Sequence, residues 1–175
     1  MHDENLNTIN KVIVLFIFDK MDMPITDSTI VELATSRNRW LSYLDCKITL
    51  GQLVDNGFLY QTNQENTLYY NITPNGRMCV SHFYNKIPQS LQHNIADFIK
   101  ENRMSLRRNQ EYFRHYFKNP DGTYTVTLKI IDPVQTTLEI KINVANQNAA
   151  KQAYERWEEK AATMFFWIHE QLVDS

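Results

Sequence analysis

The chain has 175 residues, of which 43% are apolar, 12% aromatic and 22% charged. This composition excludes an intrinsically disordered tail, and a chain of this length buries about 70% of the surface that its unfolded form exposes. The formal net charge is −2, which argues against a protein that holds nucleic acid by bulk positive charge alone. We therefore expect one folded domain or two small ones.

Cysteine content and hydropathy predict the compartment. Two cysteines, Cys46 and Cys79, are too few for a disulfide framework, so both are expected to be reduced thiols. The first residues are acidic, unlike the basic start of a secretory signal. The longest apolar run, Val12–Phe18, is much shorter than the roughly 20 residues of a membrane span. These features predict a soluble, cytoplasmic protein without membrane contact.

Apolar periodicity and turn-forming residues predict the elements of the first half. They are helices over 6–21, 27–37 and 45–56, strands over 58–62 and 67–72, and a helix over 74–84. Thr26 or Asp27 is expected to cap the second helix and Asp45 the third. Gly57 suits the positive φ that ends a helix, and Thr73 is expected to cap the fourth helix. The polar residues 63–66 form the expected hairpin turn.

The second half is expected to form a separate small domain. Its predicted elements are a helix over 90–102, strands over 108–117, 124–130 and 137–144, and a long helix over 147–173. The sequence therefore predicts an α+β protein. We expect a winged helix-turn-helix over 1–86, followed by an α-β-β-β-α domain over 87–175 with a three-stranded antiparallel meander and a long C-terminal helix.

Two segments carry the most specific signal. Leu53–Leu59 has the pattern of a recognition-helix end, a glycine stop and entry into a wing, and Tyr69–Gly76 that of a return strand and a Thr-x-x-Gly turn. These segments resemble winged-helix regulators of the PadR, MarR and ArsR kind. The segment Tyr69–Gly76, Arg77 and the Ile87-Pro88 junction carry a second, closer resemblance. Nearly the whole chain more closely resembles an uncharacterised winged-helix domain-of-unknown-function family of clostridial-type Gram-positive bacteria. The resemblance implies a bacterial DNA-binding transcriptional regulator and carries over no catalytic residues.

We expect helix 45–56 to enter the major groove of duplex DNA and wing 58–72 to lie over the backbone or the minor groove. Gln52 is suited to an adenine edge, Lys47 to guanine or a phosphate, and Arg37 and Arg39 to phosphates. The residues predicted to contact DNA are Arg37, Arg39, Trp40, Asp45, Lys47, Ile48, Gln52, Asn63, Gln64 and Asn66.

The charge distribution leaves a second function open. Residues 1–84 carry six positive and nine negative charges, and the wing tip 63–66 has no cation. Gly51 lies within the presumed recognition helix, where glycine costs about 1 kcal/mol relative to alanine. The alternative is a winged-helix module for protein–protein interaction that does not bind DNA directly.

Basic residues gather instead in the segment 86–118, which has seven positive and three negative charges. Aromatic side chains alternate with these basic residues in the expected strand over 108–117. This strand is either an ordinary half-buried strand or a surface on which single-stranded nucleic acid stacks. A third alternative is an anion or effector surface formed by Arg107, Arg108 and Arg114.

The last helix carries more aromatic surface than one sheet face can cover. It is expected to cover the meander and to form part of a homodimer interface. The candidate interface residues are Trp157, Met164, Phe165, Trp167 and Ile168.

Signals for enzymatic activity are missing from the sequence. It contains no glycine-rich phosphate loop, no Cys/His set with metal-ligand spacing and no Gly-x-Ser-x-Gly motif. We therefore expect no catalytic residues, no cofactor and no metal.

Overall fold

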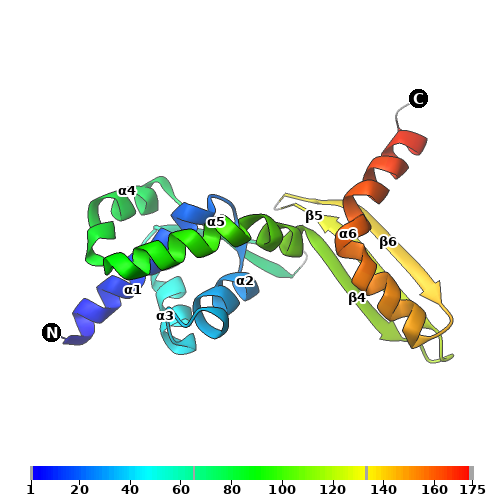
Figure 1. Ribbon diagram of the computed structural model, residues 1–175, viewed down its shortest axis with the longest axis horizontal. Coiled ribbons are helices and arrows are strands. Elements are labelled where there is room, and N and C mark those ends of the chain that lie inside the picture. The colour runs from blue at the N-terminus through cyan, green and yellow to red at the C-terminus, as the bar shows by residue number, and fades with distance from the viewer. Residues whose placement is uncertain (1, 65, 133, 174–175) are drawn as a thin grey trace. The chain divides into compact units, whose positions relative to one another are not determined.

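The computed structural model describes residues 2–64, 66–132 and 134–173 (Figure 1). The protein is α+β and divides into two compact units, Met1–Met104 and Ser105–Ser175. The elements that begin before the division are α1 (His2–Met21), β1 (Ile25–Thr26), α2 (Asp27–Glu32), the π-helical turn η1 (Leu33–Arg37), α3 (Tyr43–Asp55), β2 (Leu59–Gln64), β3 (Thr67–Ile72), α4 (Pro74–Phe83), the 3-10 turn η2 (Tyr84–Lys86) and α5 (Gln89–Glu111), which continues past it. They are followed by β4 (Tyr112–Lys118), β5 (Tyr124–Ile131), β6 (Thr136–Val144) and α6 (Gln147–Leu172).

Helix α1 forms the centre of the first unit. Its residues 12–18 are all buried, which agrees with the apolar run that predicted a helix covered on most sides. It packs against both α3 and α4 (Figure 1). The expected helix over 6–21 is confirmed and begins earlier, at His2.

Helix α3 begins earlier than the sequence analysis predicted. The cap is Ser42, whose Oγ accepts the backbone N–H of Asp45 at 3.0 Å and donates to Oδ2 of the same residue at 2.7 Å. Asp45 therefore lies in the first turn, and its assignment as the cap was wrong. Ser42 supplies the acceptor for an otherwise unpaired N–H at the start of the helix. Tyr43 and Leu44, which lie between Ser42 and Asp45, are therefore helical.

The hairpin of the first unit extends further than expected. Strands β2 and β3 pair from Leu59 with Ile72 to Gln64 with Thr67, so Asn63 and Gln64 belong to a strand and not to the turn. Strand β1, which the sequence analysis missed because two residues have no periodicity, pairs with β3 and completes an antiparallel sheet of order β1-β3-β2.

Both ends of this hairpin are set by local signals that the sequence displays. Gly57 has a φ of +75°, and Thr73 caps α4 by accepting the N–H of Gly76 at 3.0 Å. A Cβ at Gly76 would collide with the carbonyl oxygen of Phe58 and with the side chain of Ile72. The Thr-x-x-Gly turn therefore requires glycine because the chain entering the hairpin passes directly against it.

Helix α5 continues to Glu111, so the expected strand from Arg108 was wrong over its first four positions, 108–111. Leu106 is buried on the continuing helix, and Arg107 pairs with Glu111 one turn later, with Nε 2.7 Å from Oε1. The compact units divide after Met104, whereas the sequence analysis placed the domain boundary after residue 86. Ile95 and Ile99 of α5 are buried in the first unit, which is why its first part belongs there.

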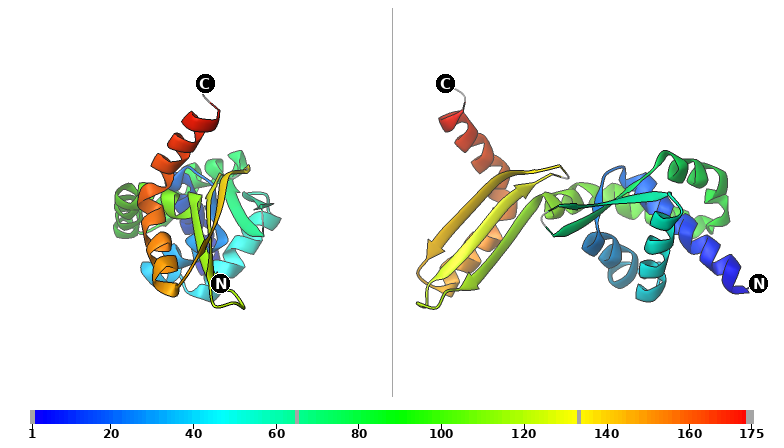
Figure 2. Two further views of the ribbon diagram at one scale, coloured as in Figure 1. Left: turned by 90° about the vertical axis from the view of Figure 1, so that its right-hand side faces the viewer. Right: turned by 180° about the vertical axis from the view of Figure 1, so that it is seen from behind.

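The second unit is a three-stranded antiparallel sheet of order β4-β5-β6, with α6 along one face (Figure 2). Its buried core consists of Val126, Leu128, Ala150, Trp157 and Ala161. Trp157 is only 1% exposed, and its Nε1 donates to the carbonyl oxygen of Lys129 at 3.3 Å. Its assignment to a dimer interface was therefore wrong, because packing of α6 on the sheet already covers it.

Candidate functional site

The N-terminal half of α3 presents an uncovered apolar surface. Tyr43 is 64% exposed, Leu44 66% and Ile48 47%, while Cys46, Thr49, Leu50 and Leu53 turn into the core. Ile48 is exposed as predicted, but Tyr43 and Leu44 were missed because the helix was expected to begin at Asp45. The pattern Ser42-x-x-Asp45, a capping-box spacing, was the signal that places them on the helix.

Gly51 lies on the same face, one turn beyond Ile48. A Cβ built on it meets no atom within 4 Å beyond the adjoining residues and the helix's own backbone, and its backbone is helical. Neither packing within the chain nor backbone conformation therefore requires glycine at this exposed position.

Lys47 forms an ion pair with Asp27 beside strand β3. Its Nζ lies 2.7 Å from Oδ1 of Asp27, and the hydroxyl of Tyr70 donates to the same oxygen at 3.0 Å. The hydrogen bond to Asp27 raises the pKa of Lys47. Burial, followed by the hydrogen bond to Asp27, raises the pKa of Tyr70. The three residues join α2, α3 and β3, so the cation predicted to contact DNA is engaged within the first unit.

The polar residues of α3 and the hairpin that were predicted to contact DNA differ in exposure. Gln52 and Gln64 are half-buried, and the Oε1 of each is a buried atom without a hydrogen-bond partner among the described residues. Asn63 and Asn66 are exposed, and Asn66 has a φ of +64° at the hairpin turn. Asn63 and Asn66 are therefore the predicted hairpin residues open to a ligand.

Arg37 and Trp40 contact helix α5 within the first unit. The Arg37 guanidinium lies 4.9 Å from the centre of the Phe98 ring and donates to Oδ1 of Asn102 at 3.2 Å. Trp40 donates from Nε1 to Oδ1 of Asn94 at 2.9 Å and packs in a T-shaped arrangement with the Phe98 ring. The segment before α3 is thus anchored to α5. Arg39, between them, is exposed, with a φ of +54°.

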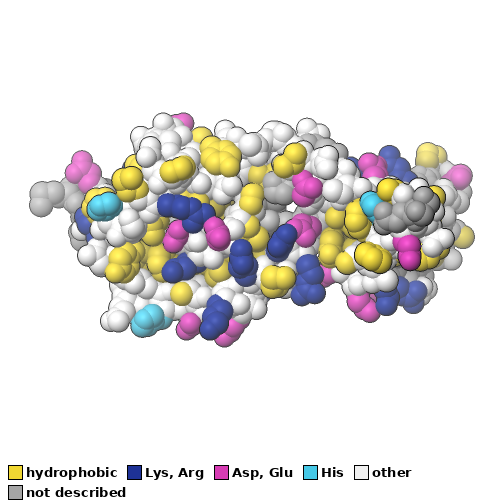
Figure 3. All heavy atoms as spheres, turned by 90° about the horizontal axis from the view of Figure 1, so that it is seen from above, with side chains coloured by type: hydrophobic (Ala, Val, Ile, Leu, Met, Phe, Trp, Pro, Cys, Tyr) yellow, Lys and Arg dark blue, Asp and Glu magenta, His cyan; other side chains and the backbone are white. Residues whose placement is uncertain are grey.

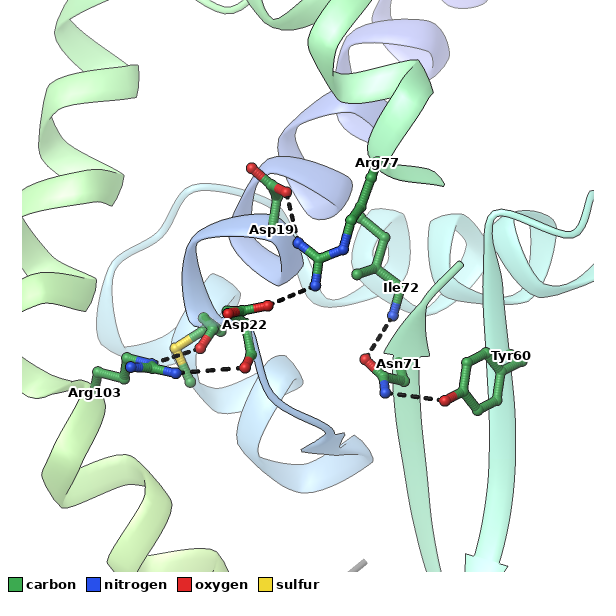
Figure 4. A network of polar contacts seen from close by, with 8 residues as sticks. Asp19, Asp22, Tyr60, Asn71, Ile72, Arg77 and Arg103 are labelled. Carbon is green, nitrogen blue, oxygen red and sulfur yellow. Dashed lines mark hydrogen bonds and ion pairs between the residues drawn. The ribbon is translucent and has the colours of Figure 1, made fainter. Parts of the chain in front are cut away.

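A network that the sequence analysis missed fixes the end of α1 (Figure 4). Arg77 of α4 reaches Asp19 at 2.9 Å and Asp22 at 2.6 Å. Arg103 of α5 donates from Nε to the carbonyl oxygen of Met21 at 2.6 Å. Arginines from two helices therefore pair with a carboxylate of α1, with the carboxylate that follows its last residue, and with a terminal carbonyl of α1. On the face drawn in Figure 3, Lys and Arg side chains are interspersed with Asp and Glu.

The three arginines predicted to form an anion surface do not share a common site. Arg107 pairs with Glu111, and Arg108 is exposed on α5. Arg114 of β4 lies 4.6 Å from the centre of the Tyr154 ring and 3.4 Å from Oε2 of Glu158. Arg114, Tyr154 and Glu158 line a cavity of about 290 Å³ in the second unit, where an anion would meet the Glu158 carboxylate as well.

The end of α6 carries uncovered apolar residues. Beyond Ala161 the helix leaves the sheet, and Phe166 is 73% exposed and Trp167 61% (Figure 2). Met164 is exposed, whereas Phe165 and Ile168 are half-buried. Four of the five predicted interface residues therefore lie on this segment, without Trp157.

A wider cavity of about 390 Å³ lies between α1, α4 and α5 in the first unit. Phe16, Val80 and Ala96 supply apolar lining, and Lys20 and Tyr84 polar groups. Its size is within the range of small-molecule sites.

The described part of the chain holds neither a metal site nor a membrane span. There, no group of three or more His, Cys, Asp or Glu side chains could hold a metal ion. No described helix is long and apolar enough to cross a membrane.

The geometry therefore defines an α+β protein with one exposed helix face beside a hairpin and a second apolar surface on its last helix. The chain belongs to the family of the domain of unknown function DUF4364, whose model matches residues 10–172. This match confirms that a family of unknown function covers nearly the whole chain, whereas the expected relationship to winged-helix regulators stays a prediction. Comparison with curated proteins and with solved structures finds no match.

Proposed function

We propose that this protein is a DNA-binding transcriptional regulator whose first unit is a winged helix. Helix α3 would enter the major groove of duplex DNA and the β2–β3 hairpin would act as the wing. The observation that carries the proposal is the uncovered N-terminal half of α3, whose other face is buried in the core. Recognition helices of this class contact bases with their N-terminal residues.

The order of elements supports the proposal. Helix α2 and the turn η1 lead into α3, and the hairpin follows directly, stabilised by the short strand β1. An α-helix with its side chains is about 10–12 Å wide, which matches a major groove about 12 Å wide. Gly51 also fits this role, because an exposed glycine lets another molecule approach the helix closely.

The uncovered end of α6 supports a homodimer as the active form. Helix α6 has 26 residues, yet its buried side chains end at Ala161. A self-complementary apolar segment is the usual basis of a twofold dimer. Two α3 helices would then meet half-sites about 34 Å apart, one turn of DNA.

The proposal is tested by titrating fluorescent genomic duplex fragments with the full chain at two salt concentrations. Phosphate contacts predict an affinity that falls steeply with salt. Arg39→Gln is the variant of choice because Arg39 is exposed beside α3, whereas Arg37 holds Phe98 and Asn102. Lys100→Gln, another exposed cation of the first unit, is the matched control. We expect Arg39→Gln to weaken binding and to reduce the salt dependence, and Lys100→Gln to do neither.

A second candidate function, protein–protein interaction through the same face, has one specific observation in its favour. The surface of α3 is apolar at Tyr43, Leu44 and Ile48, and Lys47 beside it is already paired with Asp27. Exposed apolar patches mark protein interfaces. Absence of binding to every duplex fragment at low salt would favour this candidate over the regulator.

A further inference from the structure

The outward face of α3 has an unusual chemistry for a helix that reads bases. Leu44, Ile48 and Gly51 follow one another at i, i+4 and i+7, so they form a single stripe. Apart from the exposed Tyr43, the hydrogen-bonding residues beside this stripe are engaged within the chain or partly covered. Lys47 pairs with Asp27, Asp45 accepts the Ser42 hydroxyl, and Gln52 is half-buried.

The major groove offers only one apolar group to such a stripe. A·T pairs carry the C5-methyl group of thymine, whereas guanine and cytosine present only acceptors and a donor at their edges. Leucine and isoleucine packed on a G·C edge would remove water from polar atoms and supply no hydrogen bond in return. The same side chains packed on a methyl group remove apolar surface from water on both sides.

We propose that α3 selects operator sites in which thymine C5-methyl groups face Leu44 and Ile48. The inference rests on the proposed DNA-binding function and names the feature of the sequence that is read. Gly51 contributes by its missing side chain, since a Cβ there would stand on the same stripe toward the groove floor. With only hydrogen at this position, the helix backbone approaches closely enough for short branched side chains to reach the methyl groups.

The test uses the full chain and duplexes that it selects from a random double-stranded library. The tightest selected duplex is resynthesised with deoxyuridine in place of thymidine, which removes the methyl groups and leaves every base-pairing edge unchanged. We expect the uracil duplex to bind about tenfold more weakly, as the loss of a few buried methyl contacts predicts.

Variants separate methyl contacts from effects of uracil on DNA shape. In Leu44→Ala/Ile48→Ala the two duplexes should bind with nearly equal affinity, because the side chains that meet the methyl groups are gone. Leu6→Ala, which truncates another exposed leucine of the first unit, should keep the full difference. All three residues are at least 47% exposed, so thermal unfolding should show both variants folded.

The outcomes distinguish the two levels of the proposal. If no duplex is enriched and none binds at low salt, the DNA-binding function fails and the inference with it. If a duplex is enriched but binds equally well with uracil, the regulator stands and the methyl inference is overturned. A uracil effect that persists undiminished in the Leu44→Ala/Ile48→Ala variant also overturns it, because the effect then originates away from this stripe.

Discussion

The ammonium group of Lys47 on α3 lies 2.7 Å from the Asp27 carboxylate at the start of α2. Tyr70 of β3 donates to the same carboxylate oxygen, so one acceptor joins three elements of the first unit. The side chains of Asp27 and Lys47 are 30% and 37% exposed, which places the pair between surface and core. The Lys47 ammonium therefore links α3 to α2 and β3, although the sequence pattern predicted that it contacts DNA.

Removing the shared acceptor should destabilise the first unit. Asp27→Ala leaves the Lys47 ammonium and the Tyr70 hydroxyl without this partner, and we expect a loss of about 2 kcal/mol in the free energy of unfolding. Urea unfolding of the full chain measures it. Asp55→Ala, an exposed carboxylate at the end of α3, should change stability by less than about 0.5 kcal/mol. Equal losses in the two variants would contradict a structural role for Asp27.

The two cysteines should differ in reactivity. Burial raises the pKa of the Cys46 thiol from its ordinary value of 9.0 to about 11, and burial also raises the pKa of Cys79, which is half-buried. At pH 8 we expect iodoacetamide to alkylate Cys79 first and Cys46 only on unfolding, as mapped by mass spectrometry. Preferential labelling of Cys46 in the native protein would contradict the burial of this side of α3.

The raised pKa of Cys46 also has a consequence for stability at alkaline pH. The folded state favours the protonated thiol, so the contribution is complete below pH 9.0, the ordinary pKa, and is lost as the pH rises through about 11. Cys46→Ala should therefore show a smaller loss of stability between these pH values than the unmodified chain. Urea unfolding at both pH values provides the measurement, and an identical loss in the two proteins would argue against the thiol as its source.

Gly51→Ala should stabilise the protein and weaken DNA binding at once. Alanine is favoured over glycine within a helix by about 1 kcal/mol, and the new methyl group meets no atom of the chain. The same methyl group would stand between α3 and the groove floor. Unfolding and DNA titration on one preparation measure both effects. A stabilised variant with unchanged affinity would show that α3 does not approach DNA closely at this position.

Gly76→Ala provides the opposite case at a glycine that packing requires. The new Cβ would collide with the backbone oxygen of Phe58, so we expect a loss of stability of about 3 kcal/mol. Thermal unfolding distinguishes the two glycines. A neutral Gly76→Ala would mean that the chain between α3 and β2 can move away from α4.

The uncovered end of α6 should hold two chains together. We expect sedimentation of the full chain at micromolar concentration to give the mass of a dimer, and Phe166→Glu/Trp167→Glu to give that of a monomer with helical content intact. Charges on this apolar segment would have to be buried in the interface. Gln152→Glu, exposed on the sheet-covering half of α6, is the matched control and should remain dimeric. A monomeric unmodified chain would exclude this role for the segment.

Much of the fold was predictable because its signals are local. Thr26 and Thr73 cap the helices that follow them, Gly57 adopts the expected positive φ, and Pro74 begins α4. Each signal acts through hydrogen bonds or sterics within four residues, which a sequence displays directly. The start of α3 was misplaced because Ser42 and Asp45 are both good caps, and only the helix geometry selected Ser42.

The candidate site was less predictable because its residues have partners far along the chain. Arg37 reaches Asn102, Trp40 reaches Asn94, and Lys47 reaches Asp27. No spacing rule connects such pairs, so exposed-looking cations and aromatics were assigned to DNA. In the second unit, helical phase alone could not distinguish Trp157, which faces the sheet, from the uncovered Trp167.

The sequence by itself determined the α+β class, the order of the longer helices and strands, and most of the caps and turns, since these follow from local periodicity and short-range hydrogen bonding. The tertiary structure decided which charged side chains form ion pairs within the chain and which apolar residues stay exposed. Asp27 pairs with Lys47, and Asp19 and Asp22 pair with Arg77. Apolar side chains in the first turns of α3 and the last turns of α6 remain exposed. Side-chain partners depend on packing between distant segments, and packing exists only once the chain has folded.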